Sequence, residues 1–425
     1  AIKAGINQFL DRYQDGVNAA LKANLLTEAD VNEVIKGEFR VLIKLGLLDP
    51  PDMVPYSSIG GAEEPWLRQE NKDAVRMVTR KSIVLLKNNG NLLPLDKRTL
   101  KSIAVIGPRA NDVLLDWYSG TPPYTVSPVE GIKNKVGPGT NVSYAVGGEE
   151  AVKLAKSSDV AIVCVGNHPT GGEGAAWAKV SAPSEGREAV DRQSITLEQE
   201  ELIKQIYRAN PKTIVVLVSS FPYAINWTHE NVAAILHLAH NSQEEGNALA
   251  DVIFGDYNPA GRLVQTWPRT IDQLPAMMDY DIRHGRTYMY FKGQPLYAFG
   301  YGLSYTTFKY SNLRTSASSL AAKGSVSISV DVTNTGSRAG EEVVQMYATH
   351  LNSSVDRPLK ELKGFKRIGL EPGQSRTVTL PLKGEQLAYW DPIKKSWTVE
   401  SGTVRIQIGA SSADLKLGRE IRVTK

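Results

Sequence analysis

The stretch Val160-Ala-Ile-Val-Cys-Val-Gly166 decides the fold class of this 425-residue chain. It is a continuous apolar run rich in β-branched residues and closed by glycine, which is typical of a strand buried on both faces of a sheet. Similar runs stand at residues 103–107, Thr213–Val218 and Ala234–Leu238. Because helical patterns such as residues 197–208 separate these runs, the sequence predicts an α/β sandwich around a parallel sheet.

Composition and charge narrow the classes of partner. A hydrophobic content of 42% and a charged content of 22% are those of a globular protein. No stretch approaches the roughly 18 consecutive apolar residues of a membrane span. The formal net charge of +4 comes from scattered basic residues, so we expect neither a nucleic acid nor a membrane as partner. The single cysteine, Cys164, lies inside the apolar run and is interpreted as a small buried side chain.

The two ends of the chain show other patterns. An amphipathic helix is expected over residues 28–46, with Thr27 as N-cap, and it should lie outside the cores of the later domains. The proline-rich segment 49–55 and the pair Gly60-Gly61 indicate a linker. Beyond Ser304 the pattern becomes alternating, which predicts a β-sandwich of immunoglobulin or fibronectin type, with strands at 326–332, 376–382 and 403–408.

We also expect a helix over residues 71–86 at the start of the α/β domain. The predicted domains are therefore residues 1–60, 61–304 and 305–425. The motifs HExxH, CxxC, GxSxG, the P-loop and GxGxxG are absent, and we expect neither a metal nor a cofactor. His237 and His240 are interpreted as hydrogen-bonded structural residues.

The segment after Gly166 carries the candidate chemistry. It follows a predicted strand and precedes a helix, so it forms a long loop at the carboxyl edge of the sheet, where α/β proteins place ligand contacts. Glu173 and Glu185 each stand beside glycine, and Glu188 follows closely. A carboxyl group in an apolar cleft keeps its proton more readily, as a general acid requires. A solvated surface loop is the alternative interpretation.

Several long motifs resemble glycoside hydrolase family 3, and the resemblance runs over essentially the whole chain. The motifs are Leu25-Leu-Thr-Glu-Ala-Asp30, Leu45-Gly-Leu-Leu-Asp-Pro50, Lys81-Ser-Ile-Val-Leu-Leu-Lys-Asn-Asn-Gly-Asn-Leu-Leu-Pro-Leu95, Glu185-Gly186 with Asp191-Arg192, Asn258-Pro-Ala-Gly-Arg-Leu263, and Pro295-Leu-Tyr-Ala-Phe-Gly-Tyr-Gly-Leu-Ser-Tyr305.

This resemblance implies a (β/α)8 barrel, an α/β sandwich that lends an acid/base glutamate on a loop, and a fibronectin type III-like domain. It also implies retaining hydrolysis of terminal β-linked sugars, as in β-glucosidases and β-xylosidases acting on plant-type oligosaccharides. Residues 1–60 would be the end of the barrel domain. The family's nucleophile, an aspartate on a late barrel strand, would lie upstream of residue 1, so we expect a barrel chain or segment as partner.

The resemblance leaves the acid/base open among three residues. Glu185 is favoured because it joins a following glycine to a position near the start of a helix, and Glu173 and Glu188 are the alternatives. The chain also departs from the family at Asn7, where relatives often have aspartate, so sugar contacts expected there are in doubt.

Further site residues and the setting follow as expectations. Substrate contacts are expected from Asp116, Trp117, Tyr118, Trp177 and Arg187. Asp116-Trp-Tyr118 resembles the xylosidase-leaning branch of the family. The substrate would be an oligosaccharide or glycoside, the compartment periplasmic or secreted rather than cytoplasmic, and a homo-oligomer is left open. The competing hypothesis is a noncatalytic carbohydrate-binding or scaffolding protein that retains two family domains.

Overall fold

The computed structural model describes residues 1–60, 64–172, 179–240 and 242–424. By its internal contacts the chain divides into two compact units, residues 1–68 and 69–425. The predicted domain boundaries at 60/61 and 304/305 stay predictions.

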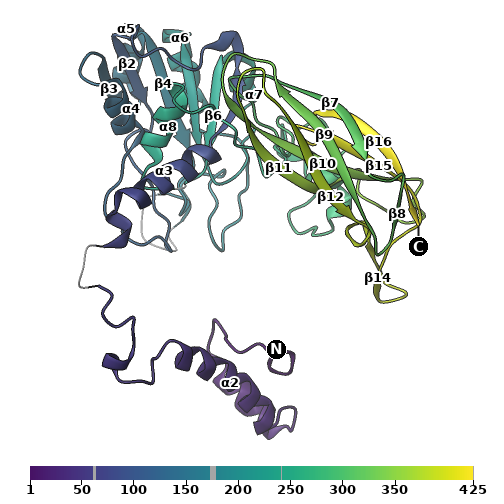
Figure 1. The fold of residues 1–425 in the computed structure, drawn as a ribbon. Helices are drawn as coiled ribbons and strands as arrows, with labels where there is room; N and C mark the ends of the chain where they lie inside the picture. Colours follow the sequence, from purple (N-terminus) through teal and green to yellow (C-terminus); the bar gives the residue numbers. More distant parts are fainter. Residues whose placement is uncertain (61–63, 173–178, 241, 425) are drawn as a thin grey trace. The chain divides into compact units, whose positions relative to one another are not determined.

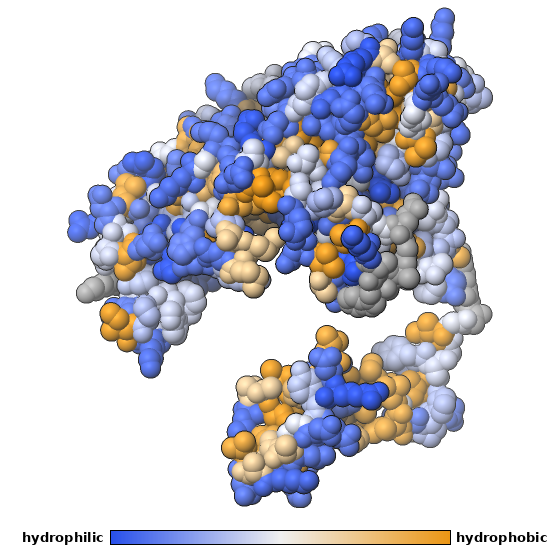
Figure 2. Space-filling model, turned by 180° about the vertical axis from the view of Figure 1, so that it is seen from behind, coloured by the Kyte–Doolittle hydropathy of each residue, from blue (hydrophilic) through white to orange (hydrophobic). Residues whose placement is uncertain are grey.

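The first unit is a small helical assembly without a core of its own. Its main helix, α2 (Glu28–Lys44), begins at a capping box in which Thr27 and Asp30 exchange hydrogen bonds. No residue that the structure describes in this unit is buried, and the apolar face of α2 exposes Ile35, Phe39 and Ile43. Figure 2 shows apolar atoms exposed over much of this unit. The shorter helices are η1 (Ile2–Ala4), α1 (Gln14–Lys22), η2 (Pro51–Met53) and η3 (Pro65–Leu67).

The first part of the second unit is built around a six-stranded sheet, of which Figure 1 labels β2, β3, β4 and β6. The strand order is β1-β6-β5-β4-β2-β3. Its central strands are apolar on both faces and fully buried, as the sequence predicts for β4. Five strands are parallel, and β1 pairs antiparallel with β6 at one edge. The strands are β1 (Val84–Asn88), β2 (Ser102–Ile106), β3 (Asn141–Ala145), β4 (Val160–Gly166), β5 (Thr213–Val218) and β6 (Ala234–Leu238).

Helices cover both faces of this sheet and create two cores. One core holds Ile103 and Cys164, and the other holds Ala104 and Val163, because neighbouring residues of a strand point to opposite faces. Helix α8 packs against α3 and α4, and α5 packs against α6. The helices are α3 (Gln69–Ser82), α4 (Pro128–Val136), α5 (Gly148–Ser157), α6 (Glu200–Ala209), α7 (Asn226–Asn231) and α8 (Glu245–Ile253), and η4 (Asn89–Asn91) follows β1.

The expected helix over residues 71–86 is confirmed as far as Ser82 and is wrong only in its last four residues. Helix α3 ends at Ser82, and residues 84–88 form the edge strand β1. The sequence of β1 is a short apolar run that fits either a helix or a strand. It forms a strand because it pairs with β6, about 150 residues later in the chain. The prediction of an all-parallel sheet is corrected at the same strand.

A buried ion network joins the helices on one face. Asp251 of α8 accepts hydrogen bonds from Arg76 of α3 at 2.6 and 2.7 Å and from Lys135 of α4 at 2.5 Å. Burial alone would raise the pKa of Asp251, but the hydrogen bonds from Arg76 and Lys135 hold it below its usual value. The three helices are thereby tied together at a desolvated position.

The remaining chain forms a β-sandwich. Strand β9 alternates buried Val326, Ile328, Val330 and Val332 with more exposed residues, as predicted. The sheets have the orders β11-β10-β15-β16-β8 and β12-β9-β7, with a hairpin β13-β14. The strands are β7 (Phe308–Thr315), β8 (Ser319–Ala321), β9 (Ser325–Asn334), β10 (Gly340–Leu351), β11 (Glu361–Leu370), β12 (Ser375–Lys383), β13 (Tyr389–Asp391), β14 (Ser396–Thr398), β15 (Gly402–Gly409) and β16 (Leu415–Thr424), with η7 (Gly384–Leu387).

A long irregular segment connects the α/β part to this sandwich. It contains η5 (Ile271–Gln273), η6 (Ile282–His284) and the short helix α9 (Thr287–Tyr290). The two parts also touch directly, since Arg262 binds Glu342 at 3.2 Å and Lys81 binds Glu341 at 2.9 Å. Among the described helices, none is long and apolar enough to cross a membrane.

The buried carboxyl group of Glu245, at the start of α8, predicts a pH-dependent stability. Its burial raises its pKa from 4.5 to about 8. Between those pH values the unfolded chain releases a proton that the folded chain keeps, so this group lowers stability as the pH rises. We expect Glu245→Gln to leave the melting temperature nearly unchanged at about pH 5 and to raise it by several degrees above about pH 8.

The matched control is Glu149→Gln, because the Glu149 side chain on α5 is 95% exposed. Thermal melts of the three proteins across this pH range measure the effect. A Glu245→Gln shift of the same size at every pH would contradict the assigned burial cost.

Candidate functional site

Four connections meet at the carboxyl edge of the sheet, where parallel strands of α/β folds place their ligand contacts. Asn167, directly after β4, is fully buried and joins three of them. Its side-chain oxygen accepts the N–H of Ser220 after β5 at 2.8 Å, and its backbone oxygen lies 3.0 Å from Nε2 of His240 after β6. Arg109, after β2, donates to the backbone oxygen of Gly166. The loop that leaves β4 therefore starts from a fixed point.

Glu185 lies within this loop and is only 4% exposed. Its carboxylate accepts the backbone N–H of His168 at 3.2 Å. Burial raises the pKa of Glu185, although the His168 hydrogen bond and the charge of Arg109 act in the opposite direction. The group is thus poised to hold a proton, but solvent and a substrate reach it poorly in this conformation.

Arg192 fixes the loop next to Glu185. Its guanidinium lies 4.1 Å from the ring centre of Phe221 and 4.7 Å from that of Tyr223, and it donates to backbone oxygens of Ser184 and Pro222. A Cβ at Gly186 would come within 2.6 Å of the Arg192 side chain. The glycine after Glu185 therefore makes room for the arginine, and its own φ is not positive.

Glu188 occupies the tip of a tight turn and is exposed. Arg187 and Val190 exchange both backbone hydrogen bonds, at 3.0 and 3.2 Å, which places Glu188 and Ala189 at the centre of the turn. Ala189 has φ +62°, a left-handed conformation that favours glycine. The Glu188 carboxylate accepts a hydrogen bond of 2.5 Å from the hydroxyl of Tyr118.

The structure brings together Trp117, Tyr118, Arg187 and Glu188, all predicted site residues. Asp116 closes its own turn by accepting the N–H groups of Tyr118 and Ser119 at 2.9 and 2.7 Å. Its hydrogen bonds, that of the Ser119 hydroxyl first, lower its pKa. This turn presents Trp117 and Tyr118, and the guanidinium carbon of Arg187 lies 5.5 Å from the Trp117 ring centre. An aromatic, cationic and carboxylate cluster thus forms from two loops about 70 residues apart.

Other predicted site residues are placed differently. Glu173 and Trp177 lie outside the described residues, and Asp116 uses its carboxylate within its own turn. Sequence reasoning did not foresee that Tyr118 meets Glu188 or that Asn167 organises the edge; the only available signal was their position after strands. His240 is a hydrogen-bonded structural residue. Within the described residues, no group of three His, Cys, Asp or Glu side chains is arranged to hold a metal ion.

The fold and the site define a protein with an α/β sandwich that carries a carboxylate-bearing loop, followed by an all-β domain. Comparison with known families gives this class a name. The glycosyl hydrolase family 3 C-terminal domain matches residues 83–305, and a fibronectin type III-like domain matches residues 342–412. The chain belongs to glycoside hydrolase family 3.

Similar proteins include enzymes for two kinds of β-glycoside. A β-xylosidase of Formosa agariphila is 39% identical over 88% of this chain and 53% of its own length. A periplasmic β-glucosidase of Salmonella typhimurium is 34% identical over 98% of this chain and 59% of its own length. The structure of a β-glucosidase from Erythrobacter marinus superposes with a TM-score of 0.80 at 30% identity, over 96% of this chain and 57% of that one. The chain spans between half and two thirds of these relatives.

The left-handed backbone of Ala189 in the turn at Glu188 predicts how substitutions at this residue change stability. Alanine in the left-handed region costs about 1 kcal/mol or more relative to glycine, which adopts it freely. We therefore expect Ala189→Gly to raise the melting temperature slightly, and Ala189→Val to lower it by several degrees. The control is Ala182→Gly in the same loop, where φ is not positive and glycine should destabilise by about 0.5–1 kcal/mol. Equal loss of stability in both glycine variants would mean that the turn is not formed.

Proposed function

We propose that this chain is the part of a retaining β-glycosidase that supplies the general acid/base, and that Glu188 carries this role. The observation that supports it best is an exposed carboxylate at the tip of a turn, which accepts the Tyr118 hydroxyl and directly follows Arg187, whose guanidinium lies over the Trp117 ring. Family membership supplies the reaction class, and the relatives' names supply the substrate class, a β-glucoside or β-xyloside.

Accessibility separates Glu188 from Glu185, which the sequence favoured. An acid/base must approach the glycosidic oxygen to within hydrogen-bond distance. Glu188 is exposed, whereas Glu185 is only 4% exposed and its carboxylate would have to leave His168. The sequence favoured Glu185 partly because a glycine follows it. In the structure, the left-handed backbone that favours glycine occurs at Ala189, directly after Glu188, and not at Gly186. The raised pKa of Glu185 suits a proton donor, so Glu185 is kept as the alternative, together with Glu173.

The proposed reaction needs a second carboxylate. In the first step a nucleophilic aspartate attacks the anomeric carbon while the acid/base protonates the departing glycosidic oxygen, and a glycosyl ester forms. In the second step the same acid/base, now a carboxylate, takes a proton from water, and the water oxygen displaces the ester at the anomeric carbon. The two carboxyl groups must lie about 5–5.5 Å apart. The family resemblance assigns the nucleophile to a barrel segment, which we propose as the partner of this chain.

The first unit supports a barrel partner. Ile35, Phe39 and Ile43 of α2 are between 39% and 60% exposed, and burying each such side chain gains about 1.5–3 kcal/mol. This helix has a capped start and an apolar face that its own unit does not cover. We propose that this face packs against the barrel. The name of the Salmonella relative supports a periplasmic or secreted location.

Aromatic side chains at the site suit a sugar substrate. The faces of sugar rings carry C–H groups that pack against aromatic rings, and Trp117 is held by Arg187 at the rim of the proposed site. Arg187 also donates to the backbone oxygen of Glu188 at 3.2 Å, so the same side chain links the aromatic turn to the acid/base turn. We propose Trp117, Tyr118 and Arg187 as substrate contacts, with Trp177 and Asp116 as further candidates.

The first kinetic prediction concerns leaving groups. In a protein that includes the barrel, Glu188→Ala should slow hydrolysis of glycosides with poor leaving groups by about 10²–10⁴-fold. Activated aryl glycosides need little protonation, so their first step should suffer far less. Azide should then restore turnover, because it attacks the glycosyl ester without a general base and yields a β-glycosyl azide.

Glu185→Ala and Glu173→Ala are the matched controls, and all variants are compared by melting temperature. Azide rescue that appears with Glu185→Ala or Glu173→Ala and not with Glu188→Ala would move the role to that residue. Rescue with none of them would place the acid/base outside this loop.

A second prediction concerns the nucleophile. The 425-residue chain, verified by mass, should not hydrolyse 4-nitrophenyl β-xyloside or β-glucoside, and a complementary barrel chain should confer activity. Phe39→Glu on α2 should weaken that reconstitution because it charges the proposed contact face, while Glu38→Lys, on the same helix, should not. Robust turnover by the chain alone would show that both carboxyl groups lie within it.

A further inference from the structure

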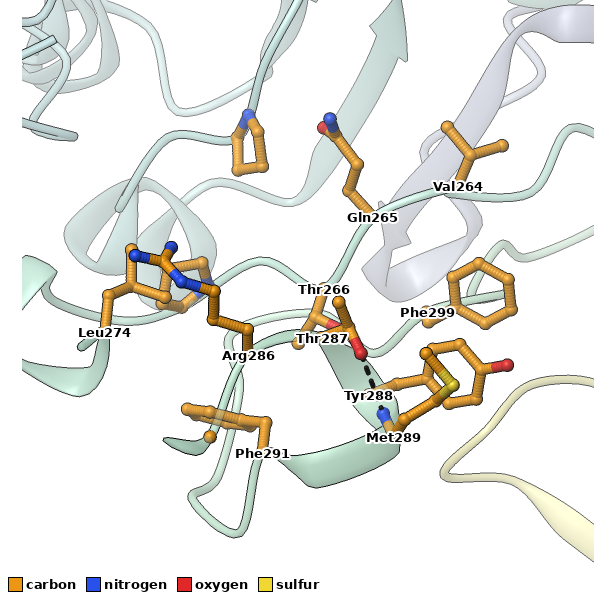
Figure 3. Close-up of a pocket in the computed structure, with 13 residues that line it drawn as sticks. Val264, Gln265, Thr266, Leu274, Arg286, Thr287, Tyr288, Met289, Phe291 and Phe299 are labelled. Carbon is orange, nitrogen blue, oxygen red and sulfur yellow. Dashed lines mark hydrogen bonds between the residues drawn. The ribbon is translucent and has the colours of Figure 1, made fainter. Parts of the chain in front are cut away.

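A cavity lies on the segment that connects the sheet to the β-sandwich. Its volume of about 390 Å³ is near the lower end of the roughly 300–1,000 Å³ typical of small-molecule sites. No residue of the turn at Glu188 or of the aromatic turn at Trp117 lines it. The walls are mostly apolar, with few polar groups, and Figure 3 shows the residues that form them.

One wall is a preformed aromatic surface. The rings of Tyr288 and Phe299 are stacked with centres 4.2 Å apart and planes inclined by 15°. Tyr288 is held further by an edge contact with Tyr347, and its hydroxyl accepts the N–H of Leu362 at 2.9 Å. In Figure 3 this wall stands across the cavity from Arg286 and Leu274. A flat ring could therefore pack here without first ordering the protein.

Arg286 supplies a positive charge at the opposite side. Its Nε donates to the backbone oxygen of Asp279 at 2.6 Å, and its Nη2 to that of Ala276 at 2.6 Å. These bonds fix the guanidinium, yet it forms no ion pair with a carboxylate of the described residues. The carboxylate of Asp279 lies 2.7 Å from Nδ1 of His284 instead. The charge of Arg286 is thus held in place, and no carboxylate in the described part of the chain pairs with it directly.

Two threonines lie between these walls, one whose hydroxyl is unpaired within the described chain and one with an unusual backbone conformation. The hydroxyl oxygen of Thr266 is buried and has no hydrogen-bond partner among the described residues, although buried polar groups normally have one. Thr287 has φ +59°, which is a genuine outlier for a β-branched residue. Strained backbone of this kind concentrates at ligand sites, where the surrounding structure maintains it.

We propose that this cavity binds a small aromatic carboxylate of cinnamate size. The ring would pack on the Tyr288–Phe299 wall, and the carboxylate would pair with Arg286 and accept the Thr266 hydroxyl. Charge complementarity with Arg286 selects an anion, and the apolar lining of Val264, Leu274 and Met289, among others, selects a ring over a sugar. A sugar would bring hydroxyl groups that these walls leave unpaired. The proposal does not depend on the glycosidase assignment.

Isothermal titration of the 425-residue chain with trans-cinnamate tests the proposal. We expect saturable binding of one molecule per chain. Cinnamamide keeps the ring and loses the charge, so it should bind at least about tenfold more weakly. This comparison tests the role of Arg286 without disturbing the loop that Arg286 holds. Glucuronate, which keeps a carboxylate but replaces the aromatic ring with a sugar, should bind more weakly still.

Variants locate the binding site. Thr266→Val keeps the shape of the side chain and should weaken cinnamate about threefold to tenfold. Phe291→Ala opens a wall of the cavity and should weaken it at least about tenfold. Phe365→Ala is the control, because Phe365 is 65% exposed on β11 and does not line the cavity. Absence of saturable binding, equal affinity for cinnamamide, tighter binding of glucuronate, or unchanged affinity in both variants at unchanged melting temperature would overturn the proposal.

Discussion

The candidate site depends on the buried amide of Asn167, which joins the loops that follow three neighbouring strands. Its Oδ1 accepts the Ser220 N–H, its Nδ2 donates to the His168 oxygen, and its backbone oxygen meets His240. A buried amide whose hydrogen bonds are satisfied is held strongly, because breaking them would leave polar groups desolvated. The loop that carries the glutamates thus starts from a rigid edge, and its tip is free to present Glu188.

The close packing of the strands enforces this arrangement from below. At Gly166, the last residue of β4, φ is +138° and a Cβ would stand 1.8 Å from the Val218 oxygen of β5. The chain can turn over the neighbouring strand only because this residue has no side chain. Glycine at residue 107 serves the end of β2 in the same way, since a Cβ there would meet the Cys164 oxygen at 2.2 Å. The backbone geometry of this edge of the sheet therefore requires glycine at both positions.

The sequence predicted the central strands and the position of the loop, but it did not resolve the choice among the glutamates. Apolar runs such as β4 can be recognised as buried strands from the sequence, because a strand covered on both faces needs no polar residue. The edge strand β1 was missed since its pairing with β6 is non-local. Glu185 is buried and Glu188 is exposed because a four-residue turn, residues 187–190, carries Glu188 to the surface. The sequence does not indicate this turn, since alanine rarely adopts the left-handed conformation that Ala189 has. The hydrogen bond from Tyr118 to Glu188 joins two loops that are far apart in the sequence, so only the structure shows it.

The central claim is that Glu188 meets the glycosidic oxygen of the substrate. A crystal structure of this chain together with the proposed barrel segment, in complex with a thio-linked disaccharide that resists hydrolysis, tests it most directly. The account predicts the Glu188 carboxylate within hydrogen-bond distance of the bridging sulfur that replaces the glycosidic oxygen, with the Trp117 ring against the sugar. A complex in which Glu185 or Glu173 occupies that place, with Glu188 facing solvent, would contradict it.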